Sequence, residues 1–139
     1  MDDDRELIDA EVLARLQAGG RVTSELYADA SRARRGLRTI ADGMLQEFDI
    51  LALPTAPIVA PKVGARSIQV DGKDLEVRSA LLSLTNLWNM TGMPAISVPA
   101  GTLEGLPVAI QLLVAPGNER TMFAAAEALQ AAHATAQSR

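Results

Sequence analysis

A long apolar stripe at helical spacing, followed by a short apolar run and then by several prolines, restricts this chain to a small set of folds. From Thr23 onward, apolar side chains recur every three or four residues as far as Phe48, which is the pattern of one helix face. Thr23 is placed to cap this helix, and Glu25 falls in its first turn. A continuous apolar run at residues 50–53 follows and is closed by Pro54. Such a run predicts a strand that is buried on both faces of an α/β sheet.

Shorter patterns predict the other elements. Leu7, Val12 and Leu16 share the spacing of a first helix, which follows the acidic residues 2–4 and ends at the paired glycines 19–20. The remaining expected elements are a hairpin that turns at Asp71-Gly72, a helix over residues 79–88, a short strand between Pro94 and Pro99, a strand over residues 106–115, and a final helix that Asn118 caps.

Composition limits the classes of function. The chain has 139 residues, 48% of them hydrophobic, which is enough for one domain with a real core. A formal net charge of −4 argues against a nucleic-acid partner, since phosphate binding needs clustered positive charge. No apolar run reaches the roughly 20 residues of a membrane span, and the acidic N-terminus is unlike a signal peptide. We therefore expect a soluble, unprocessed, cytoplasmic protein without a membrane partner.

Side chains able to do chemistry are few and scattered. His133 is the single histidine and lies on an Ala-rich helix. We interpret it as a partly buried residue without a catalytic role, in preference to a general base. With no cysteine and no second histidine, we expect no metal and no cofactor. Lys62 and Lys73 fall in loop and turn sequence, where the desolvation that makes lysine a base is not expected. No serine lies in a Gly-rich turn that exposes a nucleophile, so we assign no catalytic residue.

The long helix carries a basic face opposite its apolar stripe. Its members are Arg32, Arg34, Arg35 and Arg38. One interpretation of this face is an RNA-binding patch. Charged side chains opposite an apolar stripe usually form a solvated face, however, and we prefer the solvated face as the interpretation.

Three stretches carry a family resemblance. They are DILALPTAPIVAPKVG (49–64), VRSALLSLTNLWNMTGMPAISVPAG (77–101) and GLPVAIQLLVAPGNERTMFAAAEAL (105–129). In this order and at these spacings they resemble the C-terminal third of amidase-signature hydrolases, which cleave amide C–N bonds with a Ser–Ser–Lys triad. The implied fold is an α/β domain with a mixed sheet flanked by helices. This chain is expected to supply a partial sheet, the C-terminal portion of that fold.

The resemblance places the family's catalytic lysine and serines, with its Gly/Ser-rich signature loop, before the region that this chain matches. It therefore implies amide hydrolysis for the complete enzyme while giving this chain no nucleophile. We expect residues 1–139 to form a single incomplete domain, with two helices at 1–48 and amidase-like strands, hairpin, loop and helices at 49–139. Such a chain would be an excised fragment, a truncated product or one half of a split enzyme.

Two amides and a Gly-Pro turn are expected to have structural roles. Gly92 and Pro94, in the stretch NMTGMPAISVPAG, bracket a turn with little side-chain bulk. The Asn89 amide is expected to bridge loop backbone groups, in preference to binding substrate. Gln111, a lone amide in an apolar strand, is expected to be a satisfied buried polar group before it is a substrate contact. The resemblance also implies that residues 96–98 form an inner strand of the sheet.

Four apolar residues near this turn are candidates for the substrate-pocket wall, with core packing as the alternative. They are Leu82, Trp88, Met90 and Met93. Family members that amidate charged tRNA tend to carry an acid about seven residues before the loop asparagine, where it holds the substrate's amino group. That position is Leu82 in this chain. The resemblance thus favours an apolar or aryl amide over a glutamine amidotransferase role.

Three hypotheses of different classes remain. The first is an amidase segment that acts with an N-terminal amidase portion on a separate chain, and meets a small amide substrate only in the complete enzyme. The second is a non-catalytic binding or interaction module, and the third is a degenerate product. An incomplete sheet leaves unpaired strand edges and apolar faces, so we expect association with a partner chain or a homo-oligomer.

Overall fold

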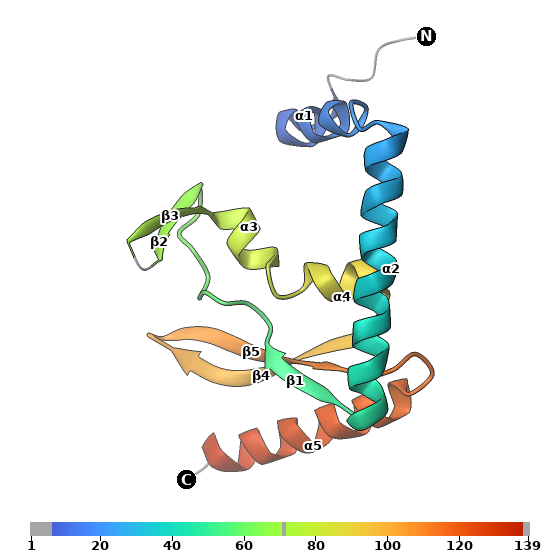
Figure 1. The fold of residues 1–139 in the computed structure, drawn as a ribbon. Coiled ribbons are helices and arrows are strands. Elements are labelled where there is room, and N and C mark those ends of the chain that lie inside the picture. The colour runs from blue at the N-terminus through green and yellow to red at the C-terminus, as the bar shows by residue number, and fades with distance from the viewer. Residues whose placement is uncertain (1–6, 71, 138–139) are drawn as a thin grey trace. The chain divides into compact units, whose positions relative to one another are not determined.

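The computed structural model describes residues 7–70 and 72–137 (Figure 1). Its elements are α1 (Ala10–Gly19), α2 (Ser24–Glu47), β1 (Leu51–Pro54), β2 (Ser67–Val70), β3 (Lys73–Glu76), α3 (Val77–Leu82), α4 (Asn86–Thr91), β4 (Ala95–Leu103), β5 (Leu106–Leu113) and α5 (Glu119–Gln137). The chain falls into two compact units, Met1–Gly36 and Leu37–Arg139, and α2 contributes to both. The acidic turn expected at residues 2–4 lies outside the described residues. Among the described residues, no helix is both long and apolar enough to cross a membrane.

Both helices that begin in the first unit start where a side chain caps them. The Asp9 Oδ1 accepts hydrogen bonds from the backbone N–H groups of Glu11 (2.9 Å) and Val12 (3.3 Å) at the start of α1. The Thr23 Oγ1 accepts from the Leu26 N–H at 3.2 Å at the start of α2. The second expected helix and its cap at Thr23 are therefore confirmed. The first helix is present and ends at the paired glycines as expected, but it begins at Ala10, so Leu7 lies before it.

The second unit is built on a three-stranded antiparallel sheet in the order β1-β5-β4. A strand is present at the apolar run 50–53, but the prediction that it is buried on both faces is wrong. Among the described strands β1 pairs with β5 alone and so lies at an edge. Its residues alternate between half-buried and exposed, because Leu51 and Leu53 pack against a core cluster while Ala52 and Pro54 point to the opposite face and are exposed. Among the described strands β4 also pairs with β5 alone and lies at the other edge, and the inner position that the resemblance implies for the complete enzyme stays a prediction. An edge is where a strand tolerates a proline such as Pro99.

Helices cover both faces of this sheet (Figure 1). The side chains of a strand point alternately to opposite faces, so Leu113 joins one core cluster while Leu112 and Val114 join the other. The members of the first cluster are Ala41, Leu45, Trp88, Met93 and Leu113, and those of the second are Val98, Leu112, Val114, Met122 and Ala126. The C-terminal part of α2 and α4 therefore pack on one face, and α5 packs on the other. This arrangement confirms a small sheet flanked by helices.

The segment between β1 and β4 differs from the prediction in one respect. The pairing of β2 and β3 in a hairpin is confirmed, and Asp71 of the expected turn lies outside the described residues. The single helix expected over residues 79–88 is instead two short helices, α3 and α4. The hydroxyl groups of Ser83 and Thr85 donate to the carbonyl oxygens of Ala80 (2.9 Å) and Leu82 (3.3 Å), respectively. The backbone N–H groups of these two residues donate to the same carbonyls at 3.2 and 3.1 Å, so the chain between α3 and α4 makes i→i−3 turns in place of the α-helical pattern.

Candidate functional site

The sequence NMTGMP forms the end of α4 and a left-handed turn after it. Gly92 has a φ of 69°, a conformation that glycine adopts without strain. Its N–H donates to the Asn89 carbonyl at 3.4 Å, and the Met93 N–H donates to the Trp88 carbonyl at 3.1 Å. This pair of hydrogen bonds is a Schellman motif, which satisfies carbonyl groups at the end of a helix. The turn expected around Gly92 is therefore present, and its geometry depends on a positive φ.

Two of the four candidate wall residues are core residues of the second unit. Trp88 is 8% exposed and Met93 is 6% exposed, and both pack with Ala41, Leu45 and Leu113. A Schellman motif commonly carries an apolar contact between these two positions. Their side chains therefore fasten the end of α4 to the sheet and to α2.

The other candidate residues near the turn are spread between the core and the surface. Leu82 is half-buried at the end of α3, whereas Met90 is 49% exposed. Asn89 is exposed, and its backbone carbonyl takes part in the turn. The Pro94 carbonyl accepts the Val114 N–H at 3.3 Å and so joins the turn to the chain after β5. A substrate contact by any of these residues, and an amide bridge by Asn89, remain predictions.

Gln111 ties two segments to the central strand. Its side chain is 3% exposed, and the Nε2 donates to the Pro54 carbonyl at 3.0 Å and to the Leu84 carbonyl at 2.9 Å. A buried amide that makes both bonds avoids the desolvation cost of an unpaired polar group. Because Pro54 ends β1 and Leu84 lies just before α4, this one side chain holds both segments to β5.

Arg38 has a role that sequence reasoning missed. Its Nη1 donates to the Thr91 carbonyl at 2.6 Å, and its Nε donates to the Asp42 carboxylate oxygens at 2.9 and 3.1 Å. The side chain is 38% exposed, so Arg38 lies at the surface as expected, but unlike the exposed Arg34 it also contacts the end of α4. Thr91 lies 53 residues further along the chain, and no local pattern reveals such a contact.

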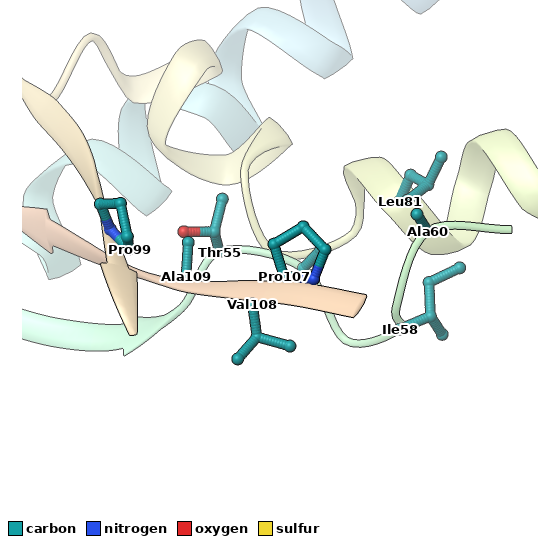
Figure 2. Close-up of a pocket in the computed structure, with 9 residues that line it drawn as sticks. Thr55, Ile58, Ala60, Leu81, Pro99, Pro107, Val108 and Ala109 are labelled. Atoms are coloured by element: carbon teal, nitrogen blue, oxygen red, sulfur yellow. The ribbon is translucent and has the colours of Figure 1, made fainter. Parts of the chain in front are cut away.

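An apolar pocket lies beside the proline-rich loop that follows β1 (Figure 2). It has a volume of about 370 Å³. The lining residues are Thr55, Ala56, Ile58, Ala60, Leu81, Pro99, Pro107, Val108 and Ala109. Figure 2 shows Val108 and Ala109 on opposite sides of β5, as alternation along a strand requires. In the described part of the chain, this lining contains none of the four candidate wall residues.

One pair of hydroxyl groups lies at the apolar pocket. Thr55 lines it, and the Thr55 Oγ1 lies 2.8 Å from the Ser97 Oγ of β4. Within residues 7–70 and 72–137, neither hydroxyl is hydrogen-bonded to a lysine or an acid, and no three histidine or acidic side chains form a metal-binding group. A hydroxyl without an adjacent base is a weak nucleophile. The lining of the described pocket is mostly apolar, as in sites that bind apolar groups.

Known proteins resemble this chain in sequence and fold. The Amidase family model matches residues 4–123. AtzE, a 1-carboxybiuret hydrolase subunit of a Pseudomonas species, is 35% identical over 106 residues, which cover 75% of this chain and 23% of that protein. A glutamyl-tRNA(Gln) amidotransferase subunit of Thermus thermophilus is 37% identical over 143 residues, 98% of this chain and 29% of that protein.

A solved structure resembles this chain in its fold as well as in its sequence. It is described as a vestigial protein complex that reveals the evolutionary origins of an s-triazine catabolic enzyme. Its chain superposes with a TM-score of 0.84 at 31% sequence identity, and the match covers 94% of this chain and 30% of that chain. The present chain thus spans less than a third of the length of each of these relatives.

Proposed function

The chain belongs to the amidase signature family, and from this premise we propose that it is the C-terminal segment of an amide hydrolase. In the complete enzyme it supplies part of the sheet and of the substrate-pocket wall, while other polypeptide carries the Ser–Ser–Lys triad. The match of the family model to residues 4–123 carries this proposal. The helix-flanked sheet supports it, because the fold agrees with a solved relative over nearly the whole chain.

The described serines support a non-nucleophilic role for this chain. Ser79 donates to the Glu76 carboxylate, Ser83 donates to a backbone carbonyl, and Ser97 pairs with Thr55. Within residues 7–70 and 72–137, no hydrogen bond joins a serine to a lysine. A serine needs an adjacent base to act as a nucleophile, so we assign bond cleavage to the polypeptide that completes the enzyme.

The substrate class that we propose is an apolar or aryl amide. Leu82 occupies the place where, by the family resemblance, amidotransferase members tend to carry an acid, and it is half-buried at the end of α3. An apolar side chain offers no charge that would hold an amino group, whereas it suits an apolar substituent. We therefore place an aryl or alkyl group, rather than glutamine, against this part of the wall.

The partner that we propose is an N-terminal amidase portion. Within the second unit, the apolar stripe of α2 is covered along one side, where Ala41 and Leu45 are buried. Its other side, which we call the outer α2 flank, consists of Leu37, Ile40, Met44 and Phe48, which are 38%, 62%, 42% and 55% exposed. An uncovered apolar helix face and edge strands favour association with another polypeptide. Self-association through the same surfaces is the alternative.

A reconstitution assay tests the proposed function. The chain is mixed with a separately produced N-terminal portion of an amidase-signature enzyme, and ammonia release from a primary aryl amide is measured. We expect release from the mixture and none from either part alone, because the nucleophile and the pocket wall then lie on different chains. Hydrolysis by this chain alone that is lost when one of its own serines is replaced would contradict the proposal.

The apolar pocket supports a second candidate function, a non-catalytic binding module. Its volume of about 370 Å³ falls within the range of small-molecule sites. Calorimetry with a primary aryl amide and the chain alone separates the two candidates. Saturable binding by the chain alone, together with an inactive mixture, would favour the binding module over the hydrolase segment.

A further inference from the structure

We propose that Arg38 and Gln111 are positioning residues that clamp α4 at both ends, so that the turns before and after this helix take one fixed place beside the sheet. The clamp exists whether or not the chain belongs to a hydrolase. Its effect on catalysis rests on the proposed function, because α3 and α4 carry Leu82 and Met90, the two candidate wall residues that lie outside the core cluster and precede the turn.

The helix α4 is too short to hold its place alone. It has six residues, whereas isolated helices shorter than about 12 residues are marginal in water. A break separates it from α3, and the left-handed turn at Gly92 follows it. Its position must therefore come from contacts with the rest of the second unit.

Gln111 holds the N-terminal end of α4. The Leu84 carbonyl, two residues before the helix, accepts from the Gln111 Nε2 at 2.9 Å, and the Pro54 carbonyl accepts from the same nitrogen at 3.0 Å. These acceptors lie 27 and 57 residues from Gln111 in sequence. One buried amide thus fixes the start of α4 relative to both β5 and the end of β1.

Arg38 holds the C-terminal end of α4. The Schellman motif uses the carbonyls of Trp88 and Asn89, and the Thr91 carbonyl accepts from the Arg38 Nη1. A positive charge beside carbonyl groups at a helix C-terminus is favourable. Asp42, one turn further along α2, accepts two hydrogen bonds from the Arg38 Nε and so orients the guanidinium. Hydrogen bonds made by charged groups contribute more than neutral ones.

Trp88 lies between the two clamped ends and is anchored in the apolar core. The helix is therefore fixed by one apolar anchor and by a polar contact at each end. Leu82 lies just before the first polar contact, and Met90 lies just before the second. A pocket wall that is no longer held in one place loses contacts with a bound substrate. Loosening the clamp should therefore change substrate binding more than it changes the fold.

Hydrogen exchange followed by mass spectrometry on the full chain tests the clamp. Arg38→Ala and Gln111→Leu should each raise amide exchange in residues 86–93 by about tenfold, because each removes a hydrogen bond that holds one end of α4. Peptides from β5 should keep the parent rate. Arg34→Ala and Gln46→Leu, which change exposed residues of α2, are the matched controls and should leave both regions unchanged.

Two milder variants keep the test decisive if an alanine variant fails to fold. Arg38→Lys keeps the charge without the planar guanidinium, and Asp42→Asn removes the carboxylate that orients it. Each should raise exchange in residues 86–93 by a smaller factor than Arg38→Ala. Unchanged exchange in these residues, or an equal increase throughout the second unit in Arg38→Lys, would overturn the clamp.

The catalytic consequence has its own readout. In an active mixture with an N-terminal amidase portion, Arg38→Ala should raise KM for the aryl amide about tenfold while kcat falls less, and Arg38→Lys should restore part of the loss. Faster exchange with an unchanged KM would overturn the positioning role. If no mixture is active, the hydrolase proposal fails, while the exchange result still decides the clamp.

Discussion

Gly92 determines where two large side chains lie. Its positive φ closes the Schellman motif that turns Met93 back toward Trp88, and both then pack in the core. The sequence predicted the turn, because a glycine and a proline bracket it. It left open whether Trp88 and Met93 pack in the core or wall a pocket, since apolar residues suit both places. The structure assigns both residues to the core.

Replacing Gly92 with alanine should lower the free energy of unfolding by about 1 kcal/mol, because an L-residue is strained in the left-handed region. The new Cβ would lie 3.5 Å from the Arg38 Nη1, an ordinary contact, so the strain comes from the backbone. Gly43→Ala, within α2, is the control and should raise the free energy of unfolding by about 0.5–1 kcal/mol, because alanine is a better helix former than glycine. Urea unfolding measures both variants, and a Gly92→Ala chain as stable as its parent would contradict the turn geometry.

Long-range contacts from side chain to backbone are the part of the site that the sequence could not reveal. Gln111 was recognisable as a lone amide in an apolar strand, and its burial followed from that pattern. Its two acceptors were not recognisable, because they are backbone carbonyls remote in sequence. Arg38 sits among similar arginines, and only the folded position of Thr91 distinguishes it.

At the scale of elements, periodicity predicted the type of nearly every helix and strand but not the order of strands in the sheet. The apolar run before Pro54 has the composition of a buried strand, yet β1 lies at an edge of the described sheet. An apolar run indicates that its side chains favour a buried environment. It does not indicate which strands pair with each other. The break between α3 and α4 was missed for a related reason, because Ser83 and Thr85 do not disturb the apolar spacing around them.

The hairpin that joins β4 to β5 contains a strained residue. Leu103 pairs with Leu106 across Glu104-Gly105, and these two have φ values of 54° and 79°. Two positive φ values in a two-residue turn are the type I′ pattern, which favours Asn-Gly. Glu104→Asn should therefore raise the free energy of unfolding by up to about 1 kcal/mol.

Urea unfolding checks this expectation. Glu127→Asn, on an exposed position of α5, is the matched control and should lower stability by a few tenths of a kcal/mol, since asparagine is a poorer helix former than glutamate. A Glu104→Asn chain less stable than its parent would show that the turn is not of this type.

At the scale of the whole molecule, the outer α2 flank is the surface on which the proposed partner rests. The sequence predicted the whole apolar stripe of α2, but which side of it the second unit covers became evident only from the packing of Ala41 and Leu45. The uncovered side ends at Phe48, shortly before β1. This surface lies within the part of the chain that matches the amidase family.

A charge placed on the outer α2 flank should weaken association. Ile40 is 62% exposed, so Ile40→Glu should leave the free energy of unfolding within about 0.5 kcal/mol of the parent value. It should reduce the mass of any self-associated species in light scattering, because the charge must be desolvated in an apolar contact. Gln46→Glu adds the same charge at an exposed position outside the flank and should have no effect. A parent chain that is monomeric at all concentrations and does not bind an N-terminal amidase portion would refute this interpretation.

The most direct measurement is the rate of ammonia release from a primary aryl amide by the purified chain, by a separately purified N-terminal amidase portion, and by their mixture. Our account predicts activity in the mixture alone, and a lower rate when the mixture contains Ile40→Glu. Turnover by the chain in the absence of any other polypeptide would contradict the account, as would a stable complex of the two parts that releases no ammonia.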